Sequence, residues 1–138
     1  MSTTPTTLSE QIEAFLAESP IGVVGASSDP SKYGYRCLHA LLEKGLEAIP
    51  VNPKGGEILG VSAVTSIADL PAGIRAINVI TPPVVTESVI DAAIAHGITR
   101  IWLQPGAEPI DAAIERARAA GIDVISHGPC ILVALASR

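Results

Sequence analysis

The chain has 138 residues, 48% of them hydrophobic and 17% charged, with a mean hydropathy of +0.42 and a formal net charge of −5. This length predicts a single domain over residues 1–138, since independent domains cluster at about 100–150 residues, and the apolar composition excludes intrinsic disorder. The acidic charge and the 3% aromatic content argue against nucleic-acid binding, which needs a basic face or stacking platforms.

The N-terminal part predicts an ordinary amphipathic helix and no export signal. Residues 1–7 carry no basic segment ahead of an apolar stretch, and no apolar run approaches the ~18 residues of a membrane span. We therefore expect a cytoplasmic protein without membrane contact. Within residues 1–19, a tail precedes a helix over residues 8–18, with Ser9 as its cap and three apolar side chains facing inward, namely Ile12, Phe15 and Leu16.

Residues 21–24 predict the first strand, and four later segments repeat one pattern. Each begins at a glycine that suits the left-handed residue past a helix end, continues as an apolar strand and closes in a polar or proline-bearing loop. These glycines are Gly45, Gly73, Gly97 and Gly121. Between these segments, apolar residues recur at intervals of three and four, which predicts three helices. The three sets are Tyr35, Leu38, Leu41 and Leu42, then Val85, Val89, Ala92 and Ala93, and then Ile110, Ala113, Ile114 and Ala117.

The lesser elements complete this pattern. Pro83 fits the first turn of its helix, residues 57–70 predict a short strand around 61–64 and one helical turn, and residues 131–136 fit a short helix or a subunit contact. The expected fold is α/β, a Rossmann-like doubly wound, mostly parallel sheet of five or six strands with helices on both faces.

Ligands of such sheets bind at the carboxyl ends of the strands. After the first strand, residues 25–34 form a glycine-bearing turn that runs into a helix, whose free amides favour a phosphate. The loop lacks the GxGxxG pattern, so its other small residues must allow the backbone to approach a phosphate closely. Its candidate binding residues are Gly25, Ala26, Ser27, Ser28, Lys32 and Tyr33.

The loop after the second strand distinguishes between nucleotides. An NAD site wants a carboxylate there to accept hydrogen bonds from the ribose, whereas this chain has Asn52, Pro53 and Lys54. A lysine suits a phosphorylated ribose, so the loop favours NADP or coenzyme A. Lys32 and Arg36 add two further cations near the same predicted pocket.

The next two strand ends supply further candidate ligand contacts. Thr81, Pro82 and Pro83 form either a rigid wall for an adenine or a pantetheine arm or simply a helix start. After the fourth strand, Trp102 is expected in the core, and Gln104 meets either the ligand or a neighbouring loop.

Five segments together resemble the small stand-alone CoA-binding proteins, which are similar to the N-terminal CoA-binding domain of the succinyl-CoA synthetase alpha subunit. They are residues 24–27, 50–54, 59–60, 81–83 and 102–106, within a resemblance that covers about residues 21–130. It implies a fold that holds coenzyme A, with the first loop around the phosphates, Asn52 to Lys54 by the 3′-phosphate, and Thr81 with Pro82 by the nucleotide or pantetheine. In the last loop only Cys130 matches, because the charged residues of the family are replaced.

The residues favour a binder over an enzyme. Cys37 is expected to be a buried thiol, and the two cysteines show no metal-ligand spacing. His127 lies near Cys130 without an obvious third residue to orient it, and the phosphohistidine chemistry of the synthetases belongs to a separate domain. We expect a non-catalytic carrier, sensor or accessory module for CoA or acyl-CoA, with an NADP-type oxidoreductase domain and a partner-binding subunit with a vestigial site as alternatives. The sequence leaves open whether the protein forms a homo-oligomer.

Overall fold

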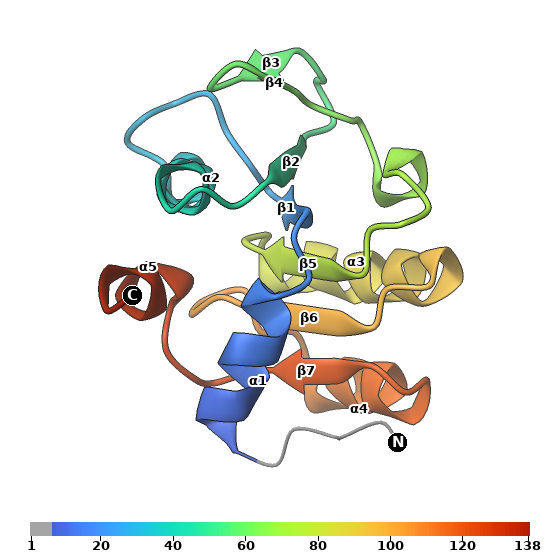
Figure 1. The fold of residues 1–138 in the computed structure, drawn as a ribbon. Coiled ribbons are helices and arrows are strands. Elements are labelled where there is room, and N and C mark those ends of the chain that lie inside the picture. The colour runs from blue at the N-terminus through green and yellow to red at the C-terminus, as the bar shows by residue number, and fades with distance from the viewer. Residues whose placement is uncertain (1–6) are drawn as a thin grey trace.

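The computed structural model describes residues 7–138, so the expected N-terminal tail lies outside the described residues, apart from Thr7. Figure 1 shows the elements in chain order, which are α1 (Leu8–Leu16), β1 (Ile21–Val24), α2 (Tyr33–Glu43), β2 (Ala48–Val51), β3 (Glu57–Ile58), β4 (Val61–Ser62), the 3-10 turn η1 (Ile67–Asp69), β5 (Ala76–Val79), α3 (Pro83–His96), β6 (Arg100–Leu103), α4 (Asp111–Ala119), β7 (Asp123–Ile125) and α5 (Ile131–Ala136).

Five strands form one parallel sheet in the order β2-β1-β5-β6-β7. The chain runs from β1 outward to β2 and then crosses back to β5 on the other side of β1, so the strand order reverses between β1 and β5 (Figure 1). This confirms the predicted Rossmann-like α/β fold. The reversal opens a crevice at the carboxyl ends of these strands, where such folds bind ligands.

Helices cover both faces of the sheet, which explains why the strands are apolar throughout. All four residues of β1 and of β5 are buried. One core cluster joins the sheet to α3, α4 and η1, and the other joins it to α1, α2 and α5. Among residues 7–138, no helix is long and apolar enough to cross a membrane.

Trp102 anchors the second cluster, as expected of a core residue. Its side chain is 0% exposed and meets the Phe15 ring edge-on, with ring centroids 5.4 Å apart. The indole Nε1 donates to the Pro129 carbonyl oxygen at 3.1 Å, which satisfies its buried polar group. Trp102 therefore holds both α1 and the loop that precedes α5 against the sheet.

Several local predictions were wrong at the ends of elements. The cap of α1 is Thr7, whose hydroxyl accepts from the Glu10 amide at 3.1 Å, so Ser9 lies inside the helix. Gly73 follows a 3-10 turn and lacks the positive φ of the other three glycines. Ile110 caps α4 and is 60% exposed.

The segment over residues 57–70 holds more structure than expected. The predicted strand around 61–64 is the second half of a hairpin, in which β3 pairs with β4 in antiparallel register. Beyond it, Val64 bridges to Val51 of β2 in parallel, with its amide donating to the Pro50 carbonyl oxygen at 3.0 Å. The expected helical turn is η1. Residues 131–136, left open by the sequence, form a helix with Ile131 and Leu135 buried.

The buried face of α3 is rotated by about one residue from the prediction. Thr86, Val89, Ile90 and Ala93 are buried, whereas Val85 is 45% exposed. The rotation is possible because the Thr86 hydroxyl is satisfied inside, at 2.7 Å from the Thr81 hydroxyl and 3.2 Å from the Pro82 carbonyl oxygen.

This rotation can be tested by two truncations on the same helix. We expect Ile90→Ala, at a fully buried position, to lower the free energy of unfolding by about 2–5 kcal/mol. Val85→Ala removes a partly exposed side chain and is expected to cost less than about 1 kcal/mol. Urea denaturation of both variants gives the comparison, and equal losses would contradict the observed face.

Candidate functional site

Two glycines bring the loop after β1 against the first turn of α2. Gly25 has φ +97°, and a Cβ there would lie 2.7 Å from the Ile80 carbonyl oxygen. A Cβ on Gly34 would lie 2.1 Å from the carbonyl oxygen of Gly25, a distance that no side chain tolerates. Gly25 was predicted, whereas the importance of Gly34 was missed. The signal available was a glycine in the first turn of an otherwise strong helix.

The N-terminus of α2 presents free backbone amides without an acidic neighbour. Its N-cap is Lys32, which makes no side-chain capping bond, and the first turn contains no acidic residue. In α1, by contrast, a threonine caps the helix and Glu10 lies in the first turn. Since unpaired amides and the helix dipole attract anions, this end of α2 fits a phosphate.

The loop between β1 and α2 is held by its own side chains. The Ser27 hydroxyl accepts from the Asp29 amide at 3.1 Å, and the Asp29 carboxylate accepts from the Ser31 amide and hydroxyl at 3.0 and 2.8 Å. The hydrogen bonds from Ser31 lower the pKa of Asp29. The one carboxylate of this loop is thus engaged within it, while Ser28 is exposed.

Asn52 ties the loop after β2 to the loop after β1. Its Nδ2 donates to the Ala26 carbonyl oxygen at 2.8 Å, and its Oδ1 accepts from the Lys54 amide at 2.8 Å. Ala26 is buried, while the side chains of Pro53 and Lys54 are exposed. The asparagine therefore acts between the loops, and the lysine is left open to solvent at the rim.

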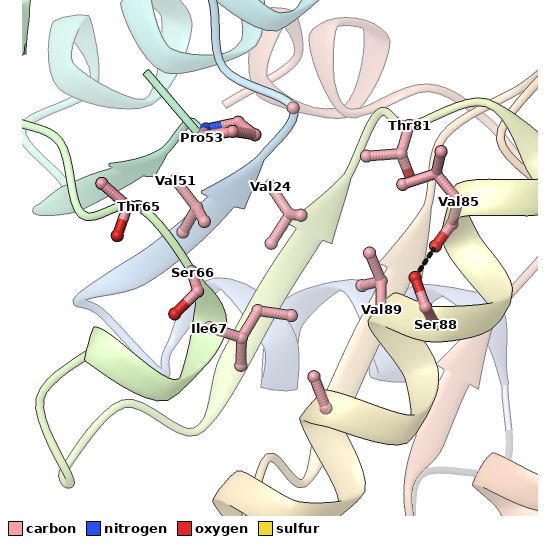
Figure 2. A pocket seen from close by; sticks show the side chains of 12 residues that line it. Val24, Val51, Pro53, Thr65, Ser66, Ile67, Thr81, Val85, Ser88 and Val89 are labelled. Atoms are coloured by element: carbon pink, nitrogen blue, oxygen red, sulfur yellow. Dashed lines mark hydrogen bonds between the residues drawn. The ribbon is translucent and has the colours of Figure 1, made fainter. Parts of the chain in front are cut away.

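An apolar cavity of about 220 Å³ opens where these strands end. Figure 2 shows valine and isoleucine side chains on its walls and hydroxyl groups at its edge. The lining residues are Val24, Gly25, Val51, Pro53, Thr65, Ser66, Ile67, Thr81, Val85, Ser88, Val89 and Ala92. The volume is below the ~300–1,000 Å³ of typical ligand pockets, so this cavity suits one part of a larger ligand.

A second depression, of about 250 Å³, lies at the ends of β5 and β6. It is lined by Tyr33, Ile80, Thr81, Pro82, Pro105, Gly106 and Ala107. Thr81 borders both hollows, and the start of α2 supplies Tyr33. The two hollows and the uncapped helix end therefore share one edge of the sheet.

Gln104 supports this edge from below. It is 0% exposed, and its Oε1 accepts from the Tyr33 hydroxyl at 3.2 Å and from the Ile131 amide at 2.8 Å. Its Nε2 donates to Oδ1 of Asn78, which is also fully buried. Its three partners belong to α2, β5 and the start of α5, and its expected contact with a ligand stays a prediction. Asn78 was missed, although an asparagine inside an apolar strand was the available signal.

The two cysteines lie in different environments. Burial raises the pKa of the Cys37 thiol to about 12. Burial also opposes ionisation of Cys130, but hydrogen bonds from the Tyr33 hydroxyl and from the Val133 and Leu132 amides lower its pKa overall. Burial and the contact with Cys130 raise the pKa of the Tyr33 hydroxyl. Cys130 is therefore the more readily ionised thiol.

His127 has an acidic neighbour that the sequence analysis missed. Its Nδ1 lies 4.0 Å from a carboxylate oxygen of Glu108, and the other oxygen of that carboxylate accepts from the Gly106 amide at 2.9 Å. Loops after two different strands bring this pair together, so no local pattern marks it. Among the described residues, no group of three or more histidines, cysteines or carboxylates could hold a metal ion.

The side chains of the predicted site residues differ in their access to solvent. Exposed side chains come from Ser28, Lys32, Arg36, Pro53, Lys54 and Pro82, partly buried ones from Ser27, Tyr33, Asn52, Thr81 and Cys130, and buried ones from Ala26 and Gln104. Their roles toward a ligand stay predictions.

Comparison with known proteins places these features in context. A family model described as a CoA binding domain matches residues 19–136. The chain is 33% identical over 86 residues to the uncharacterized protein YneT of Bacillus subtilis, covering 62% of this chain and 64% of that protein. It is 34% identical over 72 residues to the acetate–CoA ligase (ADP-forming) II subunit alpha of Pyrococcus furiosus, covering 51% of this chain and 16% of the ligase subunit. The chain thus spans less than two thirds of either relative.

Solved structures match over nearly the whole fold. A hypothetical protein from Pyrococcus horikoshii OT3 has a TM-score of 0.85 and 28% identity, covering 96% of this chain and 95% of that one. A dinucleotide-forming acetyl-coenzyme A synthetase from Ca. Korarchaeum cryptofilum, in complex with phosphate and ADP, has a TM-score of 0.71 and 29% identity, covering 82% of this chain and 26% of that one.

The close approach of the two loop glycines leads to a stability prediction. Gly34→Ala forces a Cβ against the Gly25 carbonyl oxygen and is expected to lower the free energy of unfolding by about 1–3 kcal/mol. The matched control is Gly73→Ala, since Gly73 lacks a positive φ and a Cβ there meets nothing within 4 Å. We expect the control to be neutral or to stabilise by up to about 1 kcal/mol in urea denaturation.

The buried thiol predicts how stability depends on alkaline pH. Folding raises the pKa of Cys37 from 9.0 to about 12. The contribution of this thiol to the free energy of unfolding is therefore intact below about pH 9 and is lost as the pH rises toward 12. This group alone gives a slope of up to about 1.4 kcal/mol per pH unit. Denaturant unfolding across this interval should show a shallower decline for Cys37→Ala than for the unmodified chain, and identical slopes would refute the assignment.

Proposed function

The chain belongs to the CoA-binding domain family, and from this premise we propose that it binds coenzyme A or an acyl-CoA at the carboxyl ends of its parallel strands, as a non-catalytic carrier, sensor or accessory module. The observation that carries the proposal is the loop after β2. It holds Asn52, Pro53 and the exposed Lys54 beside the cavity, where an NAD site would need a carboxylate.

The apolar cavity is the proposed site of the adenine base. Valine and isoleucine walls suit a flat heterocycle, and the hydroxyls of Thr65, Ser66 and Thr81 at its edge suit the ring nitrogens or the ribose (Figure 2). The limited volume supports a single ring system there, with the rest of the ligand outside.

The first turn of α2 is the proposed site of the pyrophosphate. Its amides are uncapped, Lys32 lies at the N-cap, and the glycine pair Gly25 and Gly34 keeps side chains out of the approach. Lys54, on the loop that Asn52 ties to this one, is the proposed partner of the 3′-phosphate. Arg36 adds a positive charge on the same helix.

The depression between Thr81 and Gly106 is the proposed path of the pantetheine arm. Its two prolines, Pro82 and Pro105, carry no amide donor, so the wall suits an apolar chain better than a phosphate. Tyr33 borders this path, and its hydroxyl contacts Cys130. The thiol end of the ligand would therefore reach the region of Tyr33.

Lys54 gives the sharpest test of this proposal. We expect calorimetry to show tighter binding of CoA than of dephospho-CoA, NADP or NAD. Lys54→Ala should weaken CoA binding by about 1–3 kcal/mol, the cost of a lost charge-assisted hydrogen bond, and leave dephospho-CoA unchanged.

The matched control is Lys44→Ala at the other end of α2, where the side chain donates to the Arg138 carbonyl oxygen at 3.0 Å. This variant should bind every ligand as the unmodified chain does. Tighter binding of NADP than of CoA would replace the proposal with an oxidoreductase-type cofactor domain, and binding of none of the four would favour a vestigial site.

A further inference from the structure

We propose that the apolar cavity at the ends of β1 and β2 selects a purine with a 6-amino group over one with a 6-oxo group, and that Asp69 sets this preference. The inference deepens the proposed function and rests on it, because it takes the cavity as the site of the base. Asp69 lies on η1, outside the set of residues that line the cavity. It acts through two hydroxyl groups that belong to that set.

Hydroxyl groups supply the side-chain polarity of this cavity. Among the described residues that line it, the polar side chains are those of Thr65, Ser66, Thr81 and Ser88. A hydroxyl has one hydrogen to donate and two lone pairs with which to accept. What these side chains can recognise therefore depends on where their four hydrogens go.

The hydrogens of Thr65 and Ser66 both go to Asp69. The two hydroxyls donate to the same carboxylate oxygen, Oδ2, at 3.0 and 3.1 Å. An ionised carboxylate only accepts, so the direction of both hydrogen bonds is fixed. Ser66 is also the N-cap of η1, yet its side chain makes no capping hydrogen bond to that turn. Capping therefore does not explain this arrangement.

The hydrogens of Ser88 and Thr81 are engaged as well. The Ser88 hydroxyl donates to the Val85 carbonyl oxygen at 2.8 Å (Figure 2). The Thr86 hydroxyl lies 3.2 Å from the carbonyl oxygens of both Thr81 and Pro82, which can only accept, so its hydrogen points to them. The Thr81 hydroxyl, 2.7 Å from that of Thr86, is then the donor of the hydrogen bond between the two.

Each of the four hydroxyls can thus accept a hydrogen bond from a ligand, and none has a hydrogen left to donate. Of the partners on an adenosine, this leaves the amine and the ribose hydroxyls, because the ring nitrogens accept as well. A 6-oxo group is an acceptor, and its purine keeps one hydrogen on the neighbouring ring nitrogen. Buried against these hydroxyls, the oxo group would lose its hydrogen bonds to water without replacement. The cavity therefore favours the 6-amino group.

Asp69 fixes the direction of two of these four hydroxyls. Its amide donates to the Ser66 carbonyl oxygen at 3.1 Å, so the turn itself holds the carboxylate near the side chains of Thr65 and Ser66. Without the carboxylate, both hydrogens could turn toward a ligand, and an oxo group would find donors. Asp69 is thus a positioning residue, which changes the preference of the cavity without lining it.

Calorimetry on the full chain with three ligands tests the preference. They are CoA, its counterpart with hypoxanthine in place of adenine, and its counterpart with unsubstituted purine. We expect CoA to bind most tightly, the unsubstituted form next, and the 6-oxo form at least about tenfold more weakly than CoA. A 6-oxo form that binds as tightly as CoA, or more tightly than the unsubstituted form, would overturn the inference and leave the proposed function intact. Binding of none of the three would refute both.

Asp69→Ala tests the positioning role. The readout is the ratio of the affinities for CoA and for its 6-oxo counterpart. The loss of one negative charge leaves this ratio unchanged, because the two ligands carry the same charge. We expect the ratio to fall by at least about fivefold, through tighter binding of the 6-oxo form to the released hydroxyls. An unchanged ratio would contradict the role of Asp69.

Two further variants complete the test. The matched control is Asp91→Ala, whose carboxylate accepts from Arg116 at 3.2 Å rather than from a cavity hydroxyl, so the ratio should not change. The double variant Thr65→Val and Ser66→Ala keeps the carboxylate and removes both acceptors. It should also lower the ratio, through weaker binding of CoA, and a ratio equal to that of the unmodified chain would exclude these hydroxyls from recognition of the base.

Discussion

The candidate site depends on one buried amide, that of Gln104. Its two polar atoms connect β5 through Asn78, α2 through Tyr33 and the start of α5 through Ile131. These elements come from both sides of the strand-order reversal, and the amide is fully enclosed. Burying a polar group costs folding free energy unless each of its polar atoms is hydrogen-bonded, so the contacts of Gln104 depend on one another. They set the position of Tyr33, which lines the depression at the ends of β5 and β6.

The fold was predictable because its signals are local. Glycines after helices, short β-branched strands and three-to-four spacing each depend on a few neighbouring residues, and together they indicated the parallel sheet and its helices. The errors occur where a hydrogen bond or the exact start of a helix decides which side chain is buried. Val85 was placed inside because valine is apolar, but the hydroxyl of Thr81 satisfies Thr86 and lets the helix turn its other face inward. Ile110 is exposed for a different reason, since α4 begins only after it.

The site was predictable in its outline and less so in its polar partners. Lys54 and the loop glycine Gly25 were predicted because strand ends mark the binding edge of such a sheet, and their roles toward a ligand stay predictions. The link from Glu108 to His127 was not, because its two residues lie in loops after different strands. The proposed phosphate site has the weakest sequence signal, since it consists of backbone amides. The sequence indicates it only through the lack of a capping side chain before α2 and through Gly34 in the first turn.

The bridge between Val64 and β2 has a consequence for how copies of this chain can associate. The outer edge of β2 would otherwise expose unpaired backbone groups. The Val64 amide donates to the Pro50 carbonyl oxygen, and proline has no amide hydrogen to donate to another strand. The opposite edge is β7, a strand of only three residues. Growth of the sheet by adding strands from a second molecule is therefore discouraged at both of its edges.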